Sequence, residues 1–343
     1  MISMKRKVLI GVGALAVVLL LVTAGIGVLL FGHPLRVEQP TYLYIDEDDT
    51  ADSVYVKLEN DLHASTLMGF RLLSLGYGYE DNIYPGAYRF QSSDSAWRIF
   101  RRLQTGNQTP VRLTIPSVRT MGQLAKAVSR RLMADSASLA KAWTDGVVIA
   151  PLGYDSCSIP ALFVPDTYEV YWTISPRDFL ARMEKEHRRF WNSERTAKAN
   201  EIGFTPVEVC TLASIVEEET ANKAEKPMVA GLYINRLHVG MPLQADPTVK
   251  FALQEFGLRR ILRVHLAADS PYNTYRHTGL PPGPIRIPSA DGIDAVLNYA
   301  HHDYLYMCAK EDFSGTHNFS KTWSEHLGNA RSYQKALNER NIK

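Results

Sequence analysis

Three consecutive glutamates, Glu217, Glu218 and Glu219, are the side chains of this sequence best suited to acid–base chemistry. They lie near the end of a segment that opens with Thr-Pro-Val-Glu at residues 205–208. A capping hydroxyl, a proline at the first helical position and a glutamate three residues after the cap predict the start of a helix. We expect this helix to extend to about residue 221.

Helical geometry separates the three glutamates, although an isolated acidic run is usually a solvated helix end. Counting back three, four and seven residues from Glu219 reaches only apolar residues, all within 212–216. Glu219 therefore continues an apolar stripe, and Glu217 falls at the edge of that buried face. Glu218 follows a more polar line, so we expect it to face solvent.

A carboxyl group on the core side of a helix end has an unusual environment. Burial disfavours its charged form, and the negative end of the helix dipole acts in the same direction. We therefore expect the pKa of Glu219 to be raised, so that it keeps its proton near neutral pH. A general acid requires this property.

Polar residues follow this helix in two later segments. Asp246 is expected to cap a helix that runs to residue 257, and Gln244 precedes it; without further evidence, loop chemistry and capping are the simpler explanation of both residues. The proline-rich stretch 270–287 contains Asn273 and Tyr275 and is expected to be an ordered loop rather than a strand. Tyrosines beside amide groups suit sugar rings, although such loops pack against cores at least as often.

The elements upstream of these residues mix strands with helices. Residues 86–90 and 111–115 alternate as strands do, and one long charged helix is expected at 176–200. Further helices are expected at 53–62, 67–75, 92–103, 122–132 and 227–237. This mixture predicts an α+β fold.

The amino-terminal segment predicts a membrane anchor. Residues 8–31 carry no charge and exceed the roughly 20 helical residues needed to cross a bilayer. Basic residues at 5–7 favour a cytoplasmic tail at residues 1–7, so the remainder would be exported. A cleaved signal peptide is the alternative, but its apolar stretch is usually about 7–15 residues and is followed by a small-residue cleavage site that is missing here.

The bulk composition excludes several classes of protein. The chain has 343 residues, of which 45% are hydrophobic and 22% charged, with a net charge of +2, which argues against disorder and against nucleic-acid binding. Cys157, Cys210 and Cys308 are far apart and are expected to be buried free thiols. The histidines lack a His-Glu-x-x-His pattern, so we expect neither a metal nor another cofactor.

Five ordered blocks of sequence resemble the MltG (YceG-like) family of endolytic murein transglycosylases. The blocks are Ala-Ser-Ile-Val-Glu-Glu-Glu-Thr at 213–220, Ile-Asn-Arg-Leu at 234–237, Leu-Gln-Ala-Asp-Pro-Thr-Val at 243–249, Ser-Pro-Tyr-Asn-Thr-Tyr at 270–275 and Gly-Leu-Pro-Pro-Gly-Pro-Ile at 279–285. Weaker likeness occurs at 86–90, 165–167 and 317–319. The resemblance covers nearly the whole chain, thinly before residue 160.

The resemblance implies roles for individual residues and segments. Glu219, the last acid before the threonine, would be the catalytic residue. The residues that would line or brace the substrate cleft are Glu217, Asn235, Gln244, Asp246, Asn273 and Tyr275. A linker and a small LysM-like α+β domain would occupy residues 32–110, and a mixed α+β catalytic domain residues 111–343.

The implied reaction is cleavage of the β-1,4 bond between N-acetylmuramic acid and N-acetylglucosamine in peptidoglycan, leaving 1,6-anhydro ends. Such an enzyme would be a single-pass protein of the cell inner membrane with a periplasmic catalytic domain. It would be able to terminate nascent glycan strands near the membrane, in contact with peptidoglycan synthases. Two alternatives remain: a glycoside hydrolase that uses Glu219 with Asp246 or Glu217, and a non-enzymatic wall-binding scaffold.

Overall fold

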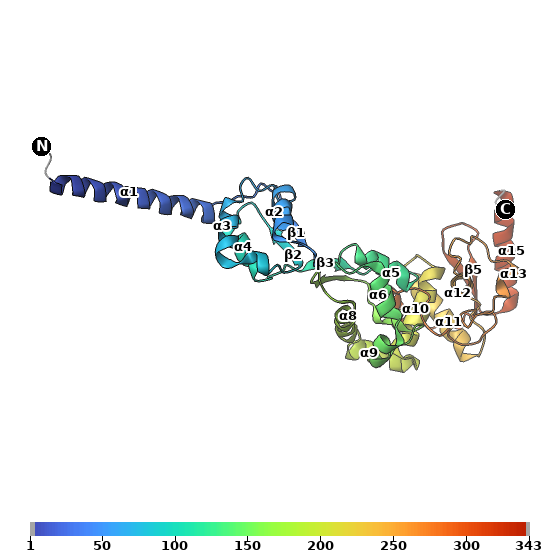
Figure 1. Cartoon of the computed structure of the whole chain (residues 1–343). Coiled ribbons are helices and arrows are strands. Elements are labelled where there is room, and N and C mark those ends of the chain that lie inside the picture. Colours follow the sequence, from blue (N-terminus) through green and yellow to red (C-terminus); the bar gives the residue numbers. More distant parts are fainter. Residues whose placement is uncertain (1–3, 341–343) are drawn as a thin grey trace. The chain divides into compact units, whose positions relative to one another are not determined.

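The computed structural model describes residues 4–340, which group into two compact units (Figure 1). Unit 1 comprises Met1–Arg112, Arg131–Met133 and Glu169–Ile174. Unit 2 comprises Leu113–Arg130, Ala134–Tyr168 and Ser175–Lys343. The chain therefore returns twice to unit 1 after entering unit 2. Helices and strands occur together in both units, which confirms the mixed α+β class.

Unit 1 begins with the long apolar helix α1 (Met4–Phe31). Its segment Arg6–Phe31 has a mean hydropathy of 2.8 and its side chains are exposed along most of its length. Within residues 4–340 this is the one helix long and apolar enough to cross a membrane. The prediction of a helix long and apolar enough to cross a membrane is therefore confirmed.

The rest of unit 1 is a small α+β core. Its elements are β1 (Thr41–Ile45), α2 (Ala51–Asn60), α3 (Met68–Tyr77), a short 3-10 turn (Tyr79–Asp81), β2 (Gly86–Phe90) and α4 (Ala96–Gln104). The two strands pair antiparallel, with Thr41 opposite Phe90 at one end and Ile45 opposite Gly86 at the other. Apolar side chains from the sheet and all three helices form one buried cluster. The predicted strand at 86–90 is confirmed.

Unit 2 is mostly helical. Its elements before the central helix are α5 (Met121–Ser129), α6 (Ser136–Thr144), α7 (Gly146–Ile149), 3-10 turns at Ala150–Leu152 and Ile159–Leu162, α8 (Pro176–Phe190) and α9 (Ser193–Ile202). From the central helix onward they are α10 (Pro206–Glu219), α11 (Lys226–His238), α12 (Asp246–Leu253), α13 (Arg263–Leu266), α14 (Ala290–Leu297), β5 (Tyr306–Ala309), β6 (His317–Ser320) and α15 (Trp323–Glu339). Strands β5 and β6 pair antiparallel, and β3 (Val111–Thr114) pairs with β4 (Thr167–Val170).

Several helix predictions are wrong in their boundaries. The single long helix expected at 176–200 is broken into α8 and α9, because the Asn192 side chain accepts the backbone N–H of Arg195 at 3.0 Å and caps a new helix. Helix α12 ends at Leu253 rather than at residue 257, and Asp246 is its first residue rather than its cap. That leaves the Asp246 carboxylate free for another partner.

Helix α10 is the centre of unit 2. Its start is as predicted: Thr205 and Glu208 form a capping box, and Pro206 occupies the first turn. Residues 209–216 are all buried, and α10 packs against α11 and α14. A helix buried on all sides gives fixed directions to the side chains at its carboxyl end.

Helix α11 approaches the loop that follows α14 very closely at Gly231. A Cβ atom there would meet the carbonyl oxygen of Ala300 and the Nε2 atom of His302, the latter at 2.8 Å. We expect Gly231→Ala to lower the free energy of unfolding by about 2 kcal/mol through overpacking, measured by denaturant titration. Gly328→Ala in α15, where a Cβ meets nothing within 4 Å, is the matched control and should be neutral or slightly stabilising. Equal midpoints for both variants would contradict the prediction.

Candidate functional site

The carboxyl end of α10 presents Glu217, Glu218 and Glu219 in three different directions, each with its own partners. One side chain is held by a lysine, one by two arginines and one by a tyrosine hydroxyl. Their electrostatic environments therefore differ, although they are neighbours in sequence.

Glu217 is bound as an anion. Lys226 donates to it at 2.9 Å, and both the backbone N–H, at 3.0 Å, and the hydroxyl of Ser289 also donate. Burial raises the pKa of Glu217, but these hydrogen bonds outweigh burial and leave it below its usual value. Because Ser289 caps α14 and Lys226 begins α11, Glu217 joins three helices.

Glu218 does not face solvent, so that prediction is wrong. Its side chain is only 12% exposed, and Arg119 donates to both carboxylate oxygens, at 2.9 and 2.8 Å. Arg286 adds a third contact at 3.0 Å. Both arginines come from segments far away in sequence, which helical periodicity cannot reveal.

Glu219 is the glutamate without a cation. The Tyr233 hydroxyl donates to its Oε1 atom at 2.9 Å, and within the described part of the chain no lysine, arginine or histidine forms an ion pair with it. Burial raises the pKa of Glu219 to about 7, with a smaller contribution from the Asp246 charge, whereas Tyr233 and more distant cations lower it. The expected raised pKa is confirmed. The residue as a whole is partly exposed.

Two further ionic groups of unit 2 influence Glu219. Arg236, one turn after Tyr233 on α11, donates to the carbonyl oxygens of Leu243 and Leu305, the latter at 2.7 Å. His317 is held by the Glu225 carboxylate, which accepts from its backbone N–H at 2.6 Å and lies 3.0 Å from Nδ1. Arg236 and His317 both lower the pKa of Glu219.

Sequence reasoning missed the contributions of Tyr233, Arg236 and Glu225. Tyr233 lies fully buried within the predicted helix 227–237. Its hydroxyl gives it a second role that apolar periodicity does not show. The only available signal was its spacing of three residues from Arg236, which places both on one side of α11.

Asn235 and Asn273 brace the backbone around this site. The Asn235 side-chain amide donates to the carbonyl oxygens of His302, at 2.6 Å, and Tyr304, at 3.1 Å. Asn273 is fully buried, and its amide donates to two carbonyl oxygens at 2.8 and 3.0 Å within the segment before it. Their contacts are with the protein itself, and they fix the loops that surround Glu219.

Asp246 and Tyr275 form a pair on the solvent side of the site. The Tyr275 hydroxyl donates to the Asp246 carboxylate at 2.6 Å, and Asp246 is exposed. Its charge raises the pKa of Glu219, so the two carboxyl groups belong to one site. Gln244 is also exposed, with a left-handed backbone at φ 50°, and its backbone N–H donates to the Thr274 carbonyl at 3.1 Å.

The histidines and cysteines of residues 4–340 form no cluster that could hold a metal ion. His302 lies 3.0 Å from the Met228 carbonyl oxygen, and His317 is bound to Glu225. The three cysteines are free thiols; Cys210 is buried, whereas Cys157 and Cys308 are partly exposed, which corrects the expectation that all three are buried.

Comparison with known proteins places the chain in a family. The model of the YceG-like family matches residues 43–332, which is most of the chain. A protein of Bacillus subtilis named endolytic murein transglycosylase is 41% identical over 167 residues, covering 48% of this chain and 45% of its own length. A protein of Streptococcus pneumoniae with the same name is 29% identical over 262 residues, covering 66% of this chain and 47% of its own length. The chain thus covers less than half the length of these relatives.

A solved structure supports the same placement. The crystal structure of a YceG-like protein from Listeria monocytogenes superposes with a TM-score of 0.56 at 26% identity. The match covers 85% of this chain and 99% of that protein. The similarity therefore extends well beyond the helix that carries the three glutamates.

Proposed function

Because the chain belongs to the YceG-like family, we propose that it is an endolytic murein transglycosylase, a lyase that cuts peptidoglycan glycan strands. The observation that carries this proposal is the state of Glu219: a partly exposed residue whose carboxyl group has no ion-pair partner among residues 4–340 and whose pKa is raised to about 7. The relatives from Bacillus subtilis and Streptococcus pneumoniae carry the same name. A carboxyl with this pKa can donate a proton and take one back near neutral pH.

In the proposed reaction, protonated Glu219 donates to the oxygen that joins N-acetylmuramic acid to N-acetylglucosamine. The bond from that oxygen to the muramic anomeric carbon breaks, and positive charge develops on this carbon. The Glu219 carboxylate then removes the proton of the same sugar's 6-hydroxyl, whose oxygen bonds to the anomeric carbon and closes a 1,6-anhydro ring. Glu219 ends protonated again, so one carboxyl group serves both steps.

Tyr233 is proposed to tune this cycle. Its hydroxyl hydrogen-bonds to the carboxylate form of Glu219 and so stabilises the form that accepts the proton in the second step. We assign substrate contacts to Gln244 and Asp246, whose side chains are exposed, and to Tyr275, whose hydroxyl donates to the Asp246 carboxylate. Glu217, Asn235 and Asn273 are assigned the role of holding the surrounding backbone.

The pH dependence of cleavage tests the role of Tyr233. Cleavage by the wild type should fall as pH rises through about 7, because the general acid loses its proton there. Tyr233→Phe removes a hydrogen bond that lowers the pKa of Glu219, so this alkaline limb should move up by about one pH unit. The measurement is the rate of glycan cleavage against pH.

Tyr154→Phe is the matched control, because its hydroxyl lies 3.3 Å from His187, outside the Glu219 site. It should leave the alkaline limb in place. An alkaline limb that stays or moves to lower pH in Tyr233→Phe would show that the hydroxyl does not stabilise the Glu219 carboxylate.

A hydrolase is the second candidate, supported by one observation: the exposed Asp246 carboxylate lies in the same site as Glu219 and could activate a water molecule. Glu217 is a poor candidate for that base because it is bound by Lys226 and Ser289. Mass spectrometry of the fragments that the full chain releases from purified peptidoglycan separates the two. Anhydro-muramic ends support the transglycosylase, and reducing ends the hydrolase.

Fragment length in the same digest tests internal cleavage. An endolytic enzyme releases long glycan fragments first, whereas an enzyme acting from strand ends releases disaccharides from the start. No product at any pH would favour a wall-binding scaffold.

We also propose that α1 anchors the chain in the cell inner membrane as a single-pass helix, with residues 1–7 cytoplasmic and residues 32–343 in the periplasm. The length and hydropathy of α1 support the anchor. Protease added to spheroplasts should remove the part of the chain that follows α1; complete protection would contradict this topology. From this position the enzyme would terminate nascent glycan strands, in contact with peptidoglycan synthases.

For the two parts outside the membrane, we propose a LysM-like module after the linker, within residues 32–110, and a catalytic domain at 111–343. The order β1, α2, α3, β2, in which the first and last strands pair with each other, supports a separate small module. All the side chains discussed around Glu219 belong to unit 2, which supports its assignment as the catalytic part.

A further inference from the structure

Helix α3 exposes a row of large apolar side chains. Met68, Leu72 and Leu75 are 62%, 47% and 76% exposed, and their spacing of four and three residues puts them on one face. The opposite face, with Phe70 and Leu73, is buried in the core of unit 1. A helix on a water-exposed surface normally carries polar residues at such positions, so this face requires an apolar partner.

The apolar row lies next to the end of α1. Gly69, the residue after Met68, is buried. It is packed so closely that a Cβ atom would meet the carbonyl oxygen of Leu29 in α1 and the Cβ of Ala96 in α4, the latter at 3.1 Å. Helices α3 and α4 both pack against α1, and Figure 1 shows them on the side of unit 1 where α1 joins it. The exposed row therefore lies close to the point where a membrane-spanning α1 would leave the bilayer.

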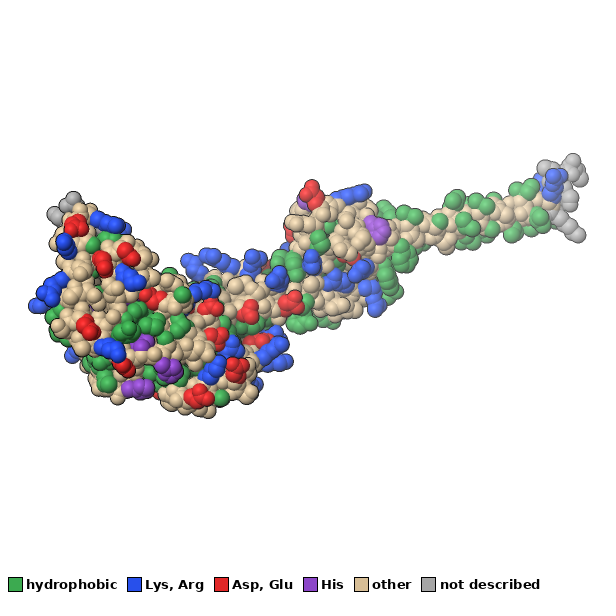
Figure 2. Space-filling view, turned by 180° about the vertical axis from the view of Figure 1, so that it is seen from behind, with side chains coloured by type: hydrophobic (Ala, Val, Ile, Leu, Met, Phe, Trp, Pro, Cys, Tyr) green, Lys and Arg blue, Asp and Glu red, His purple; other side chains and the backbone are tan. Residues whose placement is uncertain are grey.

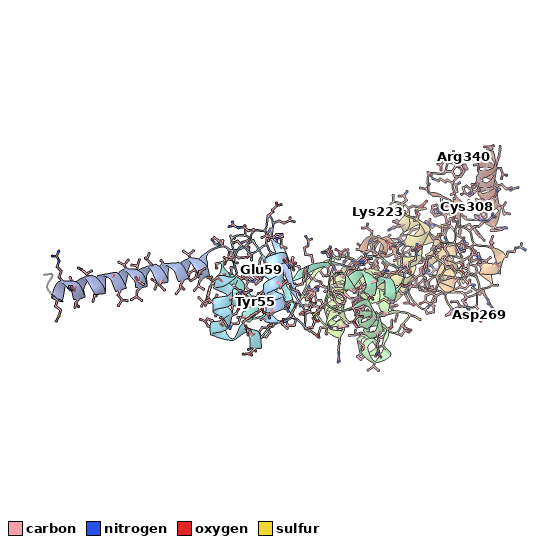
Figure 3. All side chains as sticks on the ribbon, turned by 45° about the horizontal axis from the view of Figure 1, so that its top comes forward. Tyr55, Glu59, Lys223, Asp269, Cys308 and Arg340 are labelled. Carbon is pink, nitrogen blue, oxygen red and sulfur yellow. The ribbon has the colours of Figure 1, made fainter. Side chains whose placement is uncertain are left out.

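Basic and aromatic side chains flank this row. Arg71 lies in the groove formed with Met68, Leu72 and Leu75, and its guanidinium is 4.7 Å from the ring centre of Tyr55. One acidic residue, Glu59, also lines that groove; Figure 3 labels it beside Tyr55 on α2.

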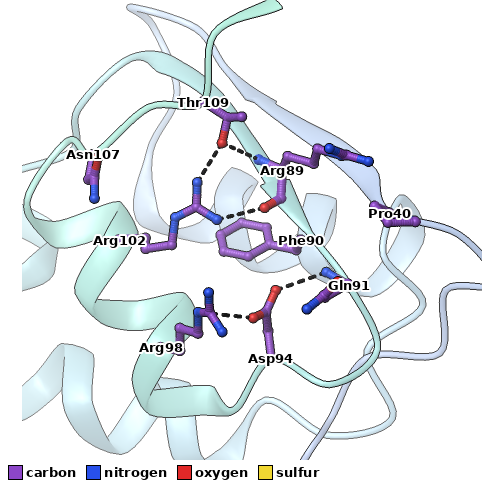
Figure 4. A pocket seen from close by; sticks show the side chains of 9 residues that line it. All are labelled: Pro40, Arg89, Phe90, Gln91, Asp94, Arg98, Arg102, Asn107 and Thr109. Carbon is purple, nitrogen blue, oxygen red and sulfur yellow. Dashed lines mark hydrogen bonds and ion pairs between the residues drawn. The ribbon is translucent and has the colours of Figure 1, made fainter.

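Helix α4 adds three arginines. Arg101 lies 5.7 Å from the ring centre of the partly buried Trp97. Arg98 and Arg102 line a pocket of about 540 Å³ beside β2 (Figure 4). Arg98 is paired with Asp94, whereas Arg102 donates to neutral oxygens only, those of Arg89, at 2.6 Å, and Thr109. Figure 2 shows hydrophobic and basic side chains together on unit 1 beside the base of α1.

We propose that this face of unit 1 docks on the surface of the lipid bilayer. The row Met68, Leu72 and Leu75 enters the boundary between headgroups and acyl chains, and Arg71 and the arginines of α4 bind anionic headgroups. Burying apolar side chains at this boundary is favourable, and basic residues near an anionic membrane surface add to the attraction. The inference rests on the proposed anchoring by α1, which supplies the nearby membrane and removes most of the entropic cost of docking.

The test uses the full chain in vesicles of phosphatidylcholine and phosphatidylglycerol, with Cys157 and Cys308 changed to serine. Cys210 stays, because it is buried in the core and burial raises the pKa of its thiol. A polarity-sensitive fluorophore is attached at Leu72→Cys. Docking predicts a blue-shifted emission that nitroxide-labelled lipid quenches.

Labels at two other positions distinguish a failure of the docking inference from a failure of the proposed anchor. Asp48 is an exposed residue shortly after Ile45, and Ile45 lies at the opposite end of the sheet from the Thr41–Phe90 pair. A label at Asp48→Cys should give a water-like, unquenched signal. Val22→Cys lies in α1 and should be quenched if α1 is inserted. Quenching at Val22 without quenching at Leu72 overturns the docking inference alone, whereas no quenching at Val22 overturns the proposed anchor.

The lipid composition tests the arginines. In vesicles of phosphatidylcholine alone, the blue shift and the quenching at Leu72→Cys should be weaker. In the vesicles that contain phosphatidylglycerol, added salt should weaken both signals. Equal signals in both kinds of vesicle would overturn the assignment of the arginines to anionic headgroups.

Discussion

Glu219→Gln should reduce glycan cleavage by about a thousandfold or more while leaving the fold intact. The substitution keeps the shape of the side chain and its ability to accept from Tyr233, but glutamine cannot donate the proton that the leaving oxygen needs. General acid–base catalysis typically contributes about 10²–10⁴-fold, and here the same group is proposed for both steps. The measurement is the initial rate of anhydro-muramic end formation by mass spectrometry.

Glu208→Gln, at the other end of α10, is the matched control for this change. Glutamine can still accept from the Thr205 backbone in the capping box, so the variant should cleave at the wild-type rate. Binding of glycan by Glu219→Gln without cleavage would support the proposed chemistry. Cleavage within a few-fold of wild type would assign the acid elsewhere.

Glu217→Gln should lower the free energy of unfolding of unit 2 by about 3 kcal/mol. The Lys226 side chain is 9% exposed, and Glu217, whose side chain is 7% exposed, is its only ion-pair partner among residues 4–340. Glutamine leaves this buried charge uncompensated and keeps only a neutral hydrogen bond to Ser289. Thermal or denaturant unfolding measures the loss.

The double variant Glu217→Gln, Lys226→Met should recover part of this loss, because it removes the unpaired charge itself. Glu218→Gln is the matched single variant and should cost less, since Arg119 is 39% exposed and water can solvate it. A larger loss in Glu218→Gln than in Glu217→Gln would contradict this ranking. So would a double variant no more stable than Glu217→Gln.

The same ion pair predicts the direction of acid unfolding. The pKa of folded Glu217 lies below the usual 4.5, so the unfolded chain binds its proton at a higher pH than the folded chain does. The stabilisation by Glu217 is therefore complete above that usual value. It is lost as pH falls through the lower, folded pKa.

Local sequence was enough to predict the framework of the site. The start of α10 follows from Thr205, Pro206 and Glu208, because capping depends on residues within one helical turn. The direction of Glu219 follows from its apolar neighbours three and four residues earlier, and its raised pKa from that burial. The length and hydropathy of α1 likewise depend only on consecutive residues.

Two predictions about site residues failed because the partner comes from a distant segment. Glu218 was expected in solvent, yet Arg119, 99 residues before it, and Arg286, 68 residues after it, enclose its carboxylate. Asp246 was expected to cap α12, but the Tyr275 hydroxyl, 29 residues later, binds its carboxylate instead.

The sequence by itself determined which helix carries the acids and which acid faces the core, because helical periodicity fixes the direction of each side chain. Only the tertiary structure decided which groups pack against each acid. Lys226 and Ser289 keep Glu217 ionised, whereas Glu219 meets a tyrosine hydroxyl and no cation in the described chain. The physical reason is that a buried carboxyl titrates according to the groups packed against it, and long-range packing brings those groups together.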